Sequence, residues 1–214
     1  MLDGESQIVE LTSRTVQGRY LLLPTDEVNE RIVGVLGRAQ RLYPVRIHCF
    51  IFMSNHVHIL IHADSAQQMA RFMGYLKGNI AKELGPIFEW KERFWGKRYH
   101  SASINSDETL IRRFLYILSN SCKEGLVASP LDWPGVTSAR AMYRGETTMK
   151  GTWYDRTAEY RARKRGQHET FPTTETVHLS PLPFLEGMNA DEQRAFIVKA
   201  VRQIEEETAE RRSA

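Results

Sequence analysis

The chain of 214 residues has little cysteine, no long apolar run and no strong excess of charge. Two cysteines, Cys49 and Cys122, are too few for a disulfide scaffold or a four-thiolate zinc site. No apolar stretch approaches the ~20 residues that a transmembrane helix requires, and the first residues lack the basic-then-apolar pattern of a signal peptide. We therefore expect a cytoplasmic protein with no membrane partner.

The residues that are present suit one folded domain with an appendage. Hydrophobic residues make up 42% of the chain and charged residues 26%, which allows a sizeable core. The net charge of +3 is too small to argue for a nucleic-acid partner. Its distribution is uneven, because residues 1–150 carry 19 basic and 15 acidic side chains whereas residues 151–214 carry 10 and 11.

A local cluster mixes basic and aromatic side chains: Lys91, Arg93, Phe94, Trp95, Lys97, Arg98 and Tyr99. Basic residues interleaved with aromatic ones suit contact with a nucleic-acid backbone combined with base stacking. The same pattern fits a solvated face beside core aromatics equally well.

The order of predicted elements indicates the fold class. Hydrophobic periodicity and end signals predict strands at 8–13, 45–53, 57–62 and 98–104, and helices at 25–42, 65–84 and 105–122. Ser54-Asn55 predicts a tight hairpin turn, Gly85-Pro86 the end of the second helix, and Asn105 with Glu108 a capping box. The order predicts an α+β fold, a ferredoxin-like split βαβ with an antiparallel sheet and helices on one face.

Four histidines, His48, His56, His58 and His62, lie in the predicted hairpin. The period of two along a strand places His56, His58 and His62 on one face. Side chains at i and i+2 lie about 6–7 Å apart, a separation that one cation can bridge, although strand histidines often only bond a neighbour. We interpret His62 as structural, and His48 receives no role.

The helix near residue 110 carries a polar face. Tyr116 lies opposite the apolar stripe, on the same side as Arg112, Arg113, Asn120 and Lys123. Tyr116 and Asn120 are neighbours at i and i+4. In an arbitrary helix this pattern is typical of a solvated basic face, but a phenol beside cations and an amide also suits nucleophilic attack on a phosphodiester.

The sequence resembles the single-tyrosine HUH transposases, especially the REP-associated tyrosine transposases of bacteria. The resemblance covers roughly residues 8–145. It rests on Thr12-Ser13-Arg14, the run HCFIFMSNHVHIL at 48–60, FWGKRY at 94–99 and YILSN at 116–120. One departure follows Asn120, where this chain reads SCKEG and relatives commonly read Pro-Val-Arg-Ala-Gly.

The resemblance implies a metal-dependent endonuclease and strand transferase that acts on single-stranded or hairpin DNA. His56, His58 and Asn120 would bind Mg²⁺ or Mn²⁺, and Tyr116 would form a 5′-phosphotyrosine intermediate. Lys97, Arg98, Arg112 and Arg113 are our candidates for phosphate contacts. The protein would act as a monomer or a homodimer.

The resemblance divides the chain into a catalytic domain, residues 1–145, and an extension, residues 146–214. A basic run (Arg161, Arg163, Lys164, Arg165) and prolines at 172, 181 and 183 predict a loop-rich linker in the extension. An amphipathic helix with Phe196, Ile197, Ala200, Val201 and Ile204 as its stripe follows, with Asn189 and Glu192 as capping residues. It could mediate dimerisation, contact DNA or cover the core.

Two other functions fit the same residues. A non-catalytic nucleic-acid-binding module would use the sheet with structural histidines, and Tyr116→Phe would then change no activity. A relaxase or replication initiator would share the HUH motif, but relaxases usually add a third histidine and initiators often add helicase modules. No Walker-type glycine loop occurs in this sequence.

Overall fold

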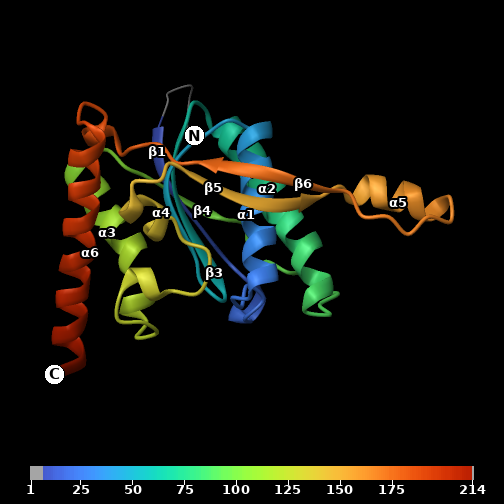
Figure 1. The fold of residues 1–214 in the computed structure, drawn as a ribbon, viewed down its shortest axis with the longest axis horizontal. Coiled ribbons are helices and arrows are strands. Elements are labelled where there is room, and N and C mark those ends of the chain that lie inside the picture. Colours follow the sequence, from blue (N-terminus) through green and yellow to red (C-terminus); the bar gives the residue numbers. More distant parts are fainter. Residues whose placement is uncertain (1–6, 214) are drawn as a thin grey trace.

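The computed structural model describes residues 7–213 and contains a four-stranded sheet, a separate β-hairpin and six α-helices in that part of the chain (Figure 1). In order, its strands and helices are β1 (Gln7–Arg14), α1 (Asp26–Leu42), β2 (Arg46–Phe52), β3 (His56–Ala63), α2 (Ala66–Ile87), β4 (His100–Ser103), α3 (Asp107–Lys123), α4 (Ala139–Arg144), β5 (Thr148–Tyr154), α5 (Arg156–Lys164), β6 (Pro172–His178) and α6 (Ala190–Ser213). Within residues 7–213, no helix is both long enough and apolar enough to cross a membrane.

The main sheet has the strand order β2-β3-β1-β4, and every neighbouring pair is antiparallel. With α1 between β1 and β2 and α2 between β3 and β4, this is the split βαβ topology predicted from the sequence. The strands pair in their predicted order, and the hairpin around Ser54-Asn55 is confirmed.

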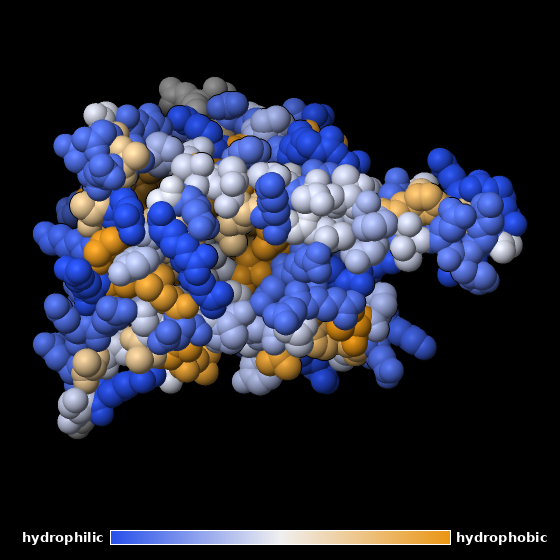
Figure 2. Space-filling view, viewed as in Figure 1, coloured by the Kyte–Doolittle hydropathy of each residue, from blue (hydrophilic) through white to orange (hydrophobic). Residues whose placement is uncertain are grey.

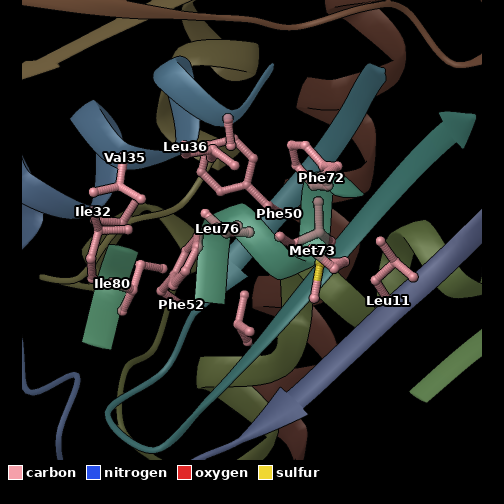
Figure 3. Close-up of a cluster of buried hydrophobic side chains, with 14 of the residues drawn as sticks. Leu11, Ile32, Val35, Leu36, Phe50, Phe52, Phe72, Met73, Leu76 and Ile80 are labelled. Atoms are coloured by element: carbon pink, nitrogen blue, oxygen red, sulfur yellow. The ribbon is translucent and has the colours of Figure 1, made fainter. Parts of the chain in front are cut away.

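Helices α1 and α2 lie together on one face of the sheet, whereas α3 packs on the other face, so the prediction that the helices share one face is wrong for α3. Phe50 and Phe52 of β2 lie among side chains of both helices, and Leu11 of β1 lies beside Met73 of α2 (Figure 3). Burial of each large apolar side chain contributes about 1.5–3 kcal/mol, so this layer holds the sheet and both helices in one unit.

The opposite face of the sheet is covered by α3 and α6. Ile51 and Leu60 of the sheet pack with Phe114 and Leu118 of α3, and α6 adds Val201 to the same cluster. The central strands β2 and β3 are therefore buried on both faces. Of the three alternatives for the C-terminal helix, the structure shows that it covers the core.

Two predicted helix ends are wrong. Helix α2 continues past Pro86 to Ile87, because a proline in the last turn removes only one bond, and the N–H groups of Phe88 and Trp90 still bond the carbonyls of Leu84 and Gly85. Helix α3 is capped by the Ser106 hydroxyl, which accepts from the N–H of Thr109, so the predicted Asn105–Glu108 box does not form.

The capping box predicted for the C-terminal helix is present. Asn189 N–H donates to the Glu192 carboxylate (2.9 Å), and Glu192 N–H donates to the Asn189 side-chain oxygen (3.0 Å). The extension also contains elements that the sequence did not predict: β5, α5 and β6 occupy the expected linker, and β5 and β6 pack on α1. The division into two domains at residue 145 stays a prediction. Residues 1–6 of the chain and Ala214 lie outside the part that the structure describes.

The aromatic members of the 91–99 cluster belong to the core. Phe94 and Trp95 are buried, and the Trp95 indole N–H donates to the carbonyl of Lys77 (2.8 Å). Lys97 and Arg98 remain exposed at the surface. The cluster is thus a cationic rim beside core aromatics and not a stacking platform built on Trp95.

Candidate active site

Strand β3 directs its histidines to the α3 face of the sheet. Val57, Ile59 and Ile61 belong to the core under α1 and α2, so His56 and His58 project to the opposite side, as strand alternation predicted. The two imidazole rings lie with their centroids 5.2 Å apart and nearly perpendicular. The two rings are therefore in edge-to-face contact.

Each imidazole is oriented by a neighbouring side chain. The Asn55 amide N–H donates to the carbonyl of Gly18 (3.1 Å), so its oxygen faces His56 and accepts from Nδ1–H (2.7 Å). The Glu10 carboxylate accepts from Nδ1–H of His58 (2.8 Å). Because both Nδ1 atoms carry the proton, both Nε2 atoms hold a free lone pair, the form that ligates metals.

Helix α3 brings two further polar side chains to these histidines. The Tyr116 ring lies against His58, with centroids 5.4 Å apart, and the side-chain oxygen of Asn120 lies 3.3 Å from Nε2 of His56. Asn120 is 2% exposed, so this contact is shielded from solvent. The structure therefore brings together four of the predicted site residues, which are separated by about sixty positions in the sequence.

The environment of His56 favours its neutral form. Burial lowers the pKa of His56 to about 4, and the nearby imidazole of His58 and the guanidinium of Arg14 act in the same direction, against the bond to Asn120. At neutral pH its Nε2 lone pair therefore faces another acceptor, the Asn120 oxygen. The Nε2 lone pair and the Asn120 oxygen together offer a cation two ligand atoms 3.3 Å apart.

The residues present thus fit a divalent cation. Within the described chain, no group of three or more His, Cys, Asp or Glu residues forms a metal site, so the donor set is two imidazoles and one amide oxygen. Neutral donors of this kind leave the full charge of the cation, and nitrogen ligands suit Mn²⁺ better than Mg²⁺.

His56, His58 and Tyr116 line a cleft of about 1000 Å³ at the end of the sheet, and the buried Asn120 contacts His56 without lining the cleft itself. Its lining comes from β1, the following turn, β3, the segment before β4, and α3: Thr12, Ser13, Arg14, Thr15, Val16, Gln17, Gly18, His56, His58, Gly96, Lys97, Arg98, His100, Tyr116 and Glu124. Gly96 is required here, because an added Cβ would lie 3.1 Å from the carbonyl oxygen of Thr15. Backbone segments therefore close the floor of the cleft tightly.

The predicted phosphate contacts divide into two places. Lys97 and Arg98 line the cleft, whereas Arg112 lines a neighbouring hollow between α3 and α6. Arg113 lies 3.5 Å from the second carboxylate oxygen of Glu10. Lys123, on the same face of α3, lies over the Tyr116 ring at 4.9 Å.

The remaining histidines of the hairpin lie away from the cleft. His62 contacts the guanidinium of Arg46 at the far end of β3. His48 is fully buried and its Nδ1 bonds the carbonyl of Pro181 (2.8 Å), which attaches the segment before α6 to the bulge of β2. Both positions are compatible with structural roles.

Three residues near the site had no predicted role. Glu10 and Asn55 orient the histidines, and Arg14 lines the cleft directly opposite His56 in the β1–β3 register. The signal in the sequence is the alternation of Glu10, Thr12 and Arg14 on one face of a strand. It becomes informative only once the strand that pairs with the histidine strand is known.

Comparison with known families adds an independent finding. Residues 15–120 match the family model described as "Transposase IS200 like", a span that contains both histidines and Tyr116 and ends at Asn120. The chain belongs to the IS200-like transposase family. Transposase-type DNA processing is accordingly the class of its function.

One solved structure supports the fold of this IS200-like transposase. The structure of a REP-associated tyrosine transposase bound to a REP hairpin is similar with a TM-score of 0.55 and 17% identity, over 66% of this chain and 82% of that one. A putative transposase from Deinococcus radiodurans R1 matches with a TM-score of 0.40 and 22% identity, over 52% of this chain and 88% of that one. No curated protein matches the sequence.

Proposed function

We propose that this protein is a metal-dependent endonuclease and strand transferase for single-stranded DNA, with Tyr116 as its nucleophile. The observation that carries the proposal is the convergence of the Tyr116 ring with His56 and His58 in one cleft, with the Asn120 side chain against His56. A hairpin or palindromic DNA is the proposed substrate, and the fold relative that is bound to a REP hairpin supports it.

Tyr116 supplies the covalent step. Its phenol oxygen attacks the scissile phosphorus while the proton of the hydroxyl passes to solvent, and the bond from phosphorus to the 3′ oxygen breaks. The products are a 5′-phosphotyrosine and a 3′-hydroxyl, which takes up one proton. Because the phosphodiester energy is kept in the new bond, the 3′-hydroxyl of a second strand can reverse the step and join DNA without ATP.

His56, His58 and Asn120 would hold the cation, and a bound Mg²⁺ or Mn²⁺ would act as a Lewis acid on the scissile phosphate. Glu10 and Asn55 keep both imidazoles in the ligating tautomer. Lys97, Arg98 and Arg14 at the cleft would bind neighbouring phosphates and align the strand with Tyr116.

The proposed site is built within one chain. Tyr116 and the three proposed ligands all come from the same copy, so a single molecule contains every group that the reaction needs. This arrangement favours action as a monomer over a homodimer with shared sites.

The decisive experiment is covalent capture. We expect a labelled single-stranded hairpin incubated with Mn²⁺ to become attached to the wild-type protein and not to Tyr116→Phe. Tyr20→Phe is the matched control, because Tyr20 is 67% exposed and outside the cleft lining. An adduct of equal yield from Tyr116→Phe would remove this residue from the mechanism.

The same assay separates the proposal from a non-catalytic binding module. In that alternative Tyr116→Phe binds the hairpin as well as the wild type and neither protein forms an adduct. His58→Ala adds a second test, since loss of cleavage with hairpin affinity retained indicates a ligand, whereas loss of both indicates a role in folding.

A further inference from the structure

The extension forms an arm that projects from the body of the molecule. We define the basic arm as β5, α5 and β6; the hairpin runs out from α1 and α5 lies at its far end, on the side opposite α6 (Figure 1). The arm lies beyond the part of the chain that the family model matches. The family match therefore assigns no role to the arm.

The base of the basic arm is held rigidly. Gly34 of α1 allows the closest approach to β5, because a Cβ there would clash with the carbonyl of Thr152. The buried carboxylate of Glu175 on β6 bonds Arg38 (2.9 Å) of α1, and Arg156 at the start of α5 bonds the buried Glu83 of α2 (2.8 Å). A rigid base presents α5 in a defined position.

The acidic groups of α5 are already occupied. Asp155 caps the helix by accepting from the N–H groups of Thr157 and Ala158, and Glu159 pairs with Arg156 (2.8 Å). The exposed cations are Arg161, Arg163, Lys164 and Arg165, and none forms an ion pair within residues 7–213. The end of the arm is thus strongly hydrophilic (Figure 2), with a net positive charge open to solvent.

The cations gather on the outward side of α5. Ala162 is fully buried, while Tyr160 is 49% exposed and has Arg163 and Lys164 over its ring at 5.9 and 4.9 Å. A hollow of about 470 Å³ between α2 and α5 adds Lys82 and His168 to this surface.

We propose that α5 of the basic arm binds the phosphate backbone of duplex DNA. Unpaired guanidinium and ammonium groups complement a polyanion. Helix α5 projects from the body and carries one exposed aromatic ring, Tyr160, whereas single strands bind in grooves with several stacking rings. A projecting helix instead fits against a duplex. This duplex would be the stem or the flank of the DNA that is held in the cleft. That identification of the duplex rests on the proposed function.

The test measures binding without cleavage. In EDTA and the Tyr116→Phe background, we expect Arg161→Gln/Arg163→Gln/Lys164→Gln to lower affinity for a long-stemmed hairpin about 10- to 100-fold. The slope of log affinity against log salt should weaken by about 2–3, because each lost phosphate contact removes about 0.9. Affinity for a short unstructured single strand should stay within about twofold, since it spans only the cleft.

The matched control is Lys199→Gln/Arg202→Gln/Arg211→Gln, which removes three exposed cations from α6 on the opposite side. We expect this variant to keep the wild-type affinity and slope. Equal losses from both variants would indicate a general charge effect and overturn the proposal. The proposal would also be overturned if the salt slope of the α5 variant were unchanged. The same holds if the α5 variant lost as much affinity for the single strand as for the hairpin. Failure of covalent capture with these binding results intact would refute only the proposed chemistry.

Discussion

Glu10 decides which nitrogen of His58 faces the cleft. Its carboxylate is 2% exposed and bonds Nδ1–H, which leaves Nε2 free. A carboxylate behind a ligating imidazole fixes the ring and raises its basicity. Glu10 is therefore a positioning residue that acts through His58 and touches neither DNA nor metal.

We expect Glu10→Ala to lower the cleavage rate about 10- to 100-fold while hairpin affinity stays near that of the wild type. Glu10→Gln should recover part of the rate, because its side-chain oxygen still accepts from Nδ1–H but lacks the charge. Single-turnover cleavage together with a binding titration measures both quantities. A parallel loss of affinity in Glu10→Ala would show that Glu10 is needed for folding instead.

Metal binding is testable without DNA. If His56, His58 and Asn120 bind Mn²⁺, free Mn²⁺ at about 100 times its dissociation constant stabilises the protein by about 2.7 kcal/mol. We expect thermal unfolding to show a Tm increase that EDTA reverses and His58→Ala abolishes. His100→Ala is the control, since His100 lines the cleft two strands from His58. If Mn²⁺ raised the Tm of His58→Ala as much as that of the wild type, His58 would be excluded as a metal ligand.

Helix α1 is shaped to carry the arm. Gly34 and Gly37 lie where β5 and β6 cross the helix, and a Cβ at Gly37 would lie 2.9 Å from the backbone of Thr176. Glycine in a helix interior costs about 0.5–1 kcal/mol relative to alanine. The close packing of β5 and β6 against α1, which these glycines allow, offsets that cost.

We expect Gly34→Ala to lower the free energy of unfolding by about 1–3 kcal/mol, because the added methyl group clashes with backbone that cannot turn aside. Gly74→Ala in α2 is the matched control, since nothing lies within 4 Å of its added Cβ. The control should be neutral or stabilising by up to about 1 kcal/mol. Urea denaturation distinguishes the two, and equal effects would contradict this account of the packing.

Across the molecule, His48 links the sheet to the segment that leads into α6. Burial lowers the pKa of His48, with Arg46 and His62 acting in the same direction and the carbonyls of Pro181 and Ser180 opposing them. The folded state thus prefers neutral His48, whereas the unfolded chain binds a proton near pH 6.5. The contribution of neutral His48 to the free energy of unfolding is complete above pH 6.5. It is lost as the pH falls from there towards the lowered pKa.

We expect the urea concentration at the unfolding midpoint to decrease as the pH is lowered from 7.5 to 5.5. The decrease should be smaller in His48→Asn. Asparagine keeps a donor near the position of Nδ1 but does not titrate. His56 and His62, whose pKa values burial also lowers, retain the rest of the dependence. An identical pH dependence in the variant would show that folding does not shift the pKa of His48.

The local structure could be predicted because it follows from neighbours in sequence. Strand alternation placed His56 and His58 on one face, and the 3.6-residue period placed Tyr116 beside Asn120. The cap at Ser106 was missed because two adjacent residues offered similar hydroxyl or amide groups. The arm was missed because prolines and polar residues also suit an edge hairpin.

The sequence by itself predicted the strands and helices as far as α3, the split βαβ topology and the types of side chain that chemistry would use, because those depend on periodicity and propensity. Only the tertiary structure decided that Glu10 stands behind His58, that Asn120 meets His56, and that the cations of α5 lie apart from the cleft. The physical reason is that such contacts join distant strands and helices. Their distances depend on how packed layers cross, which no local pattern specifies.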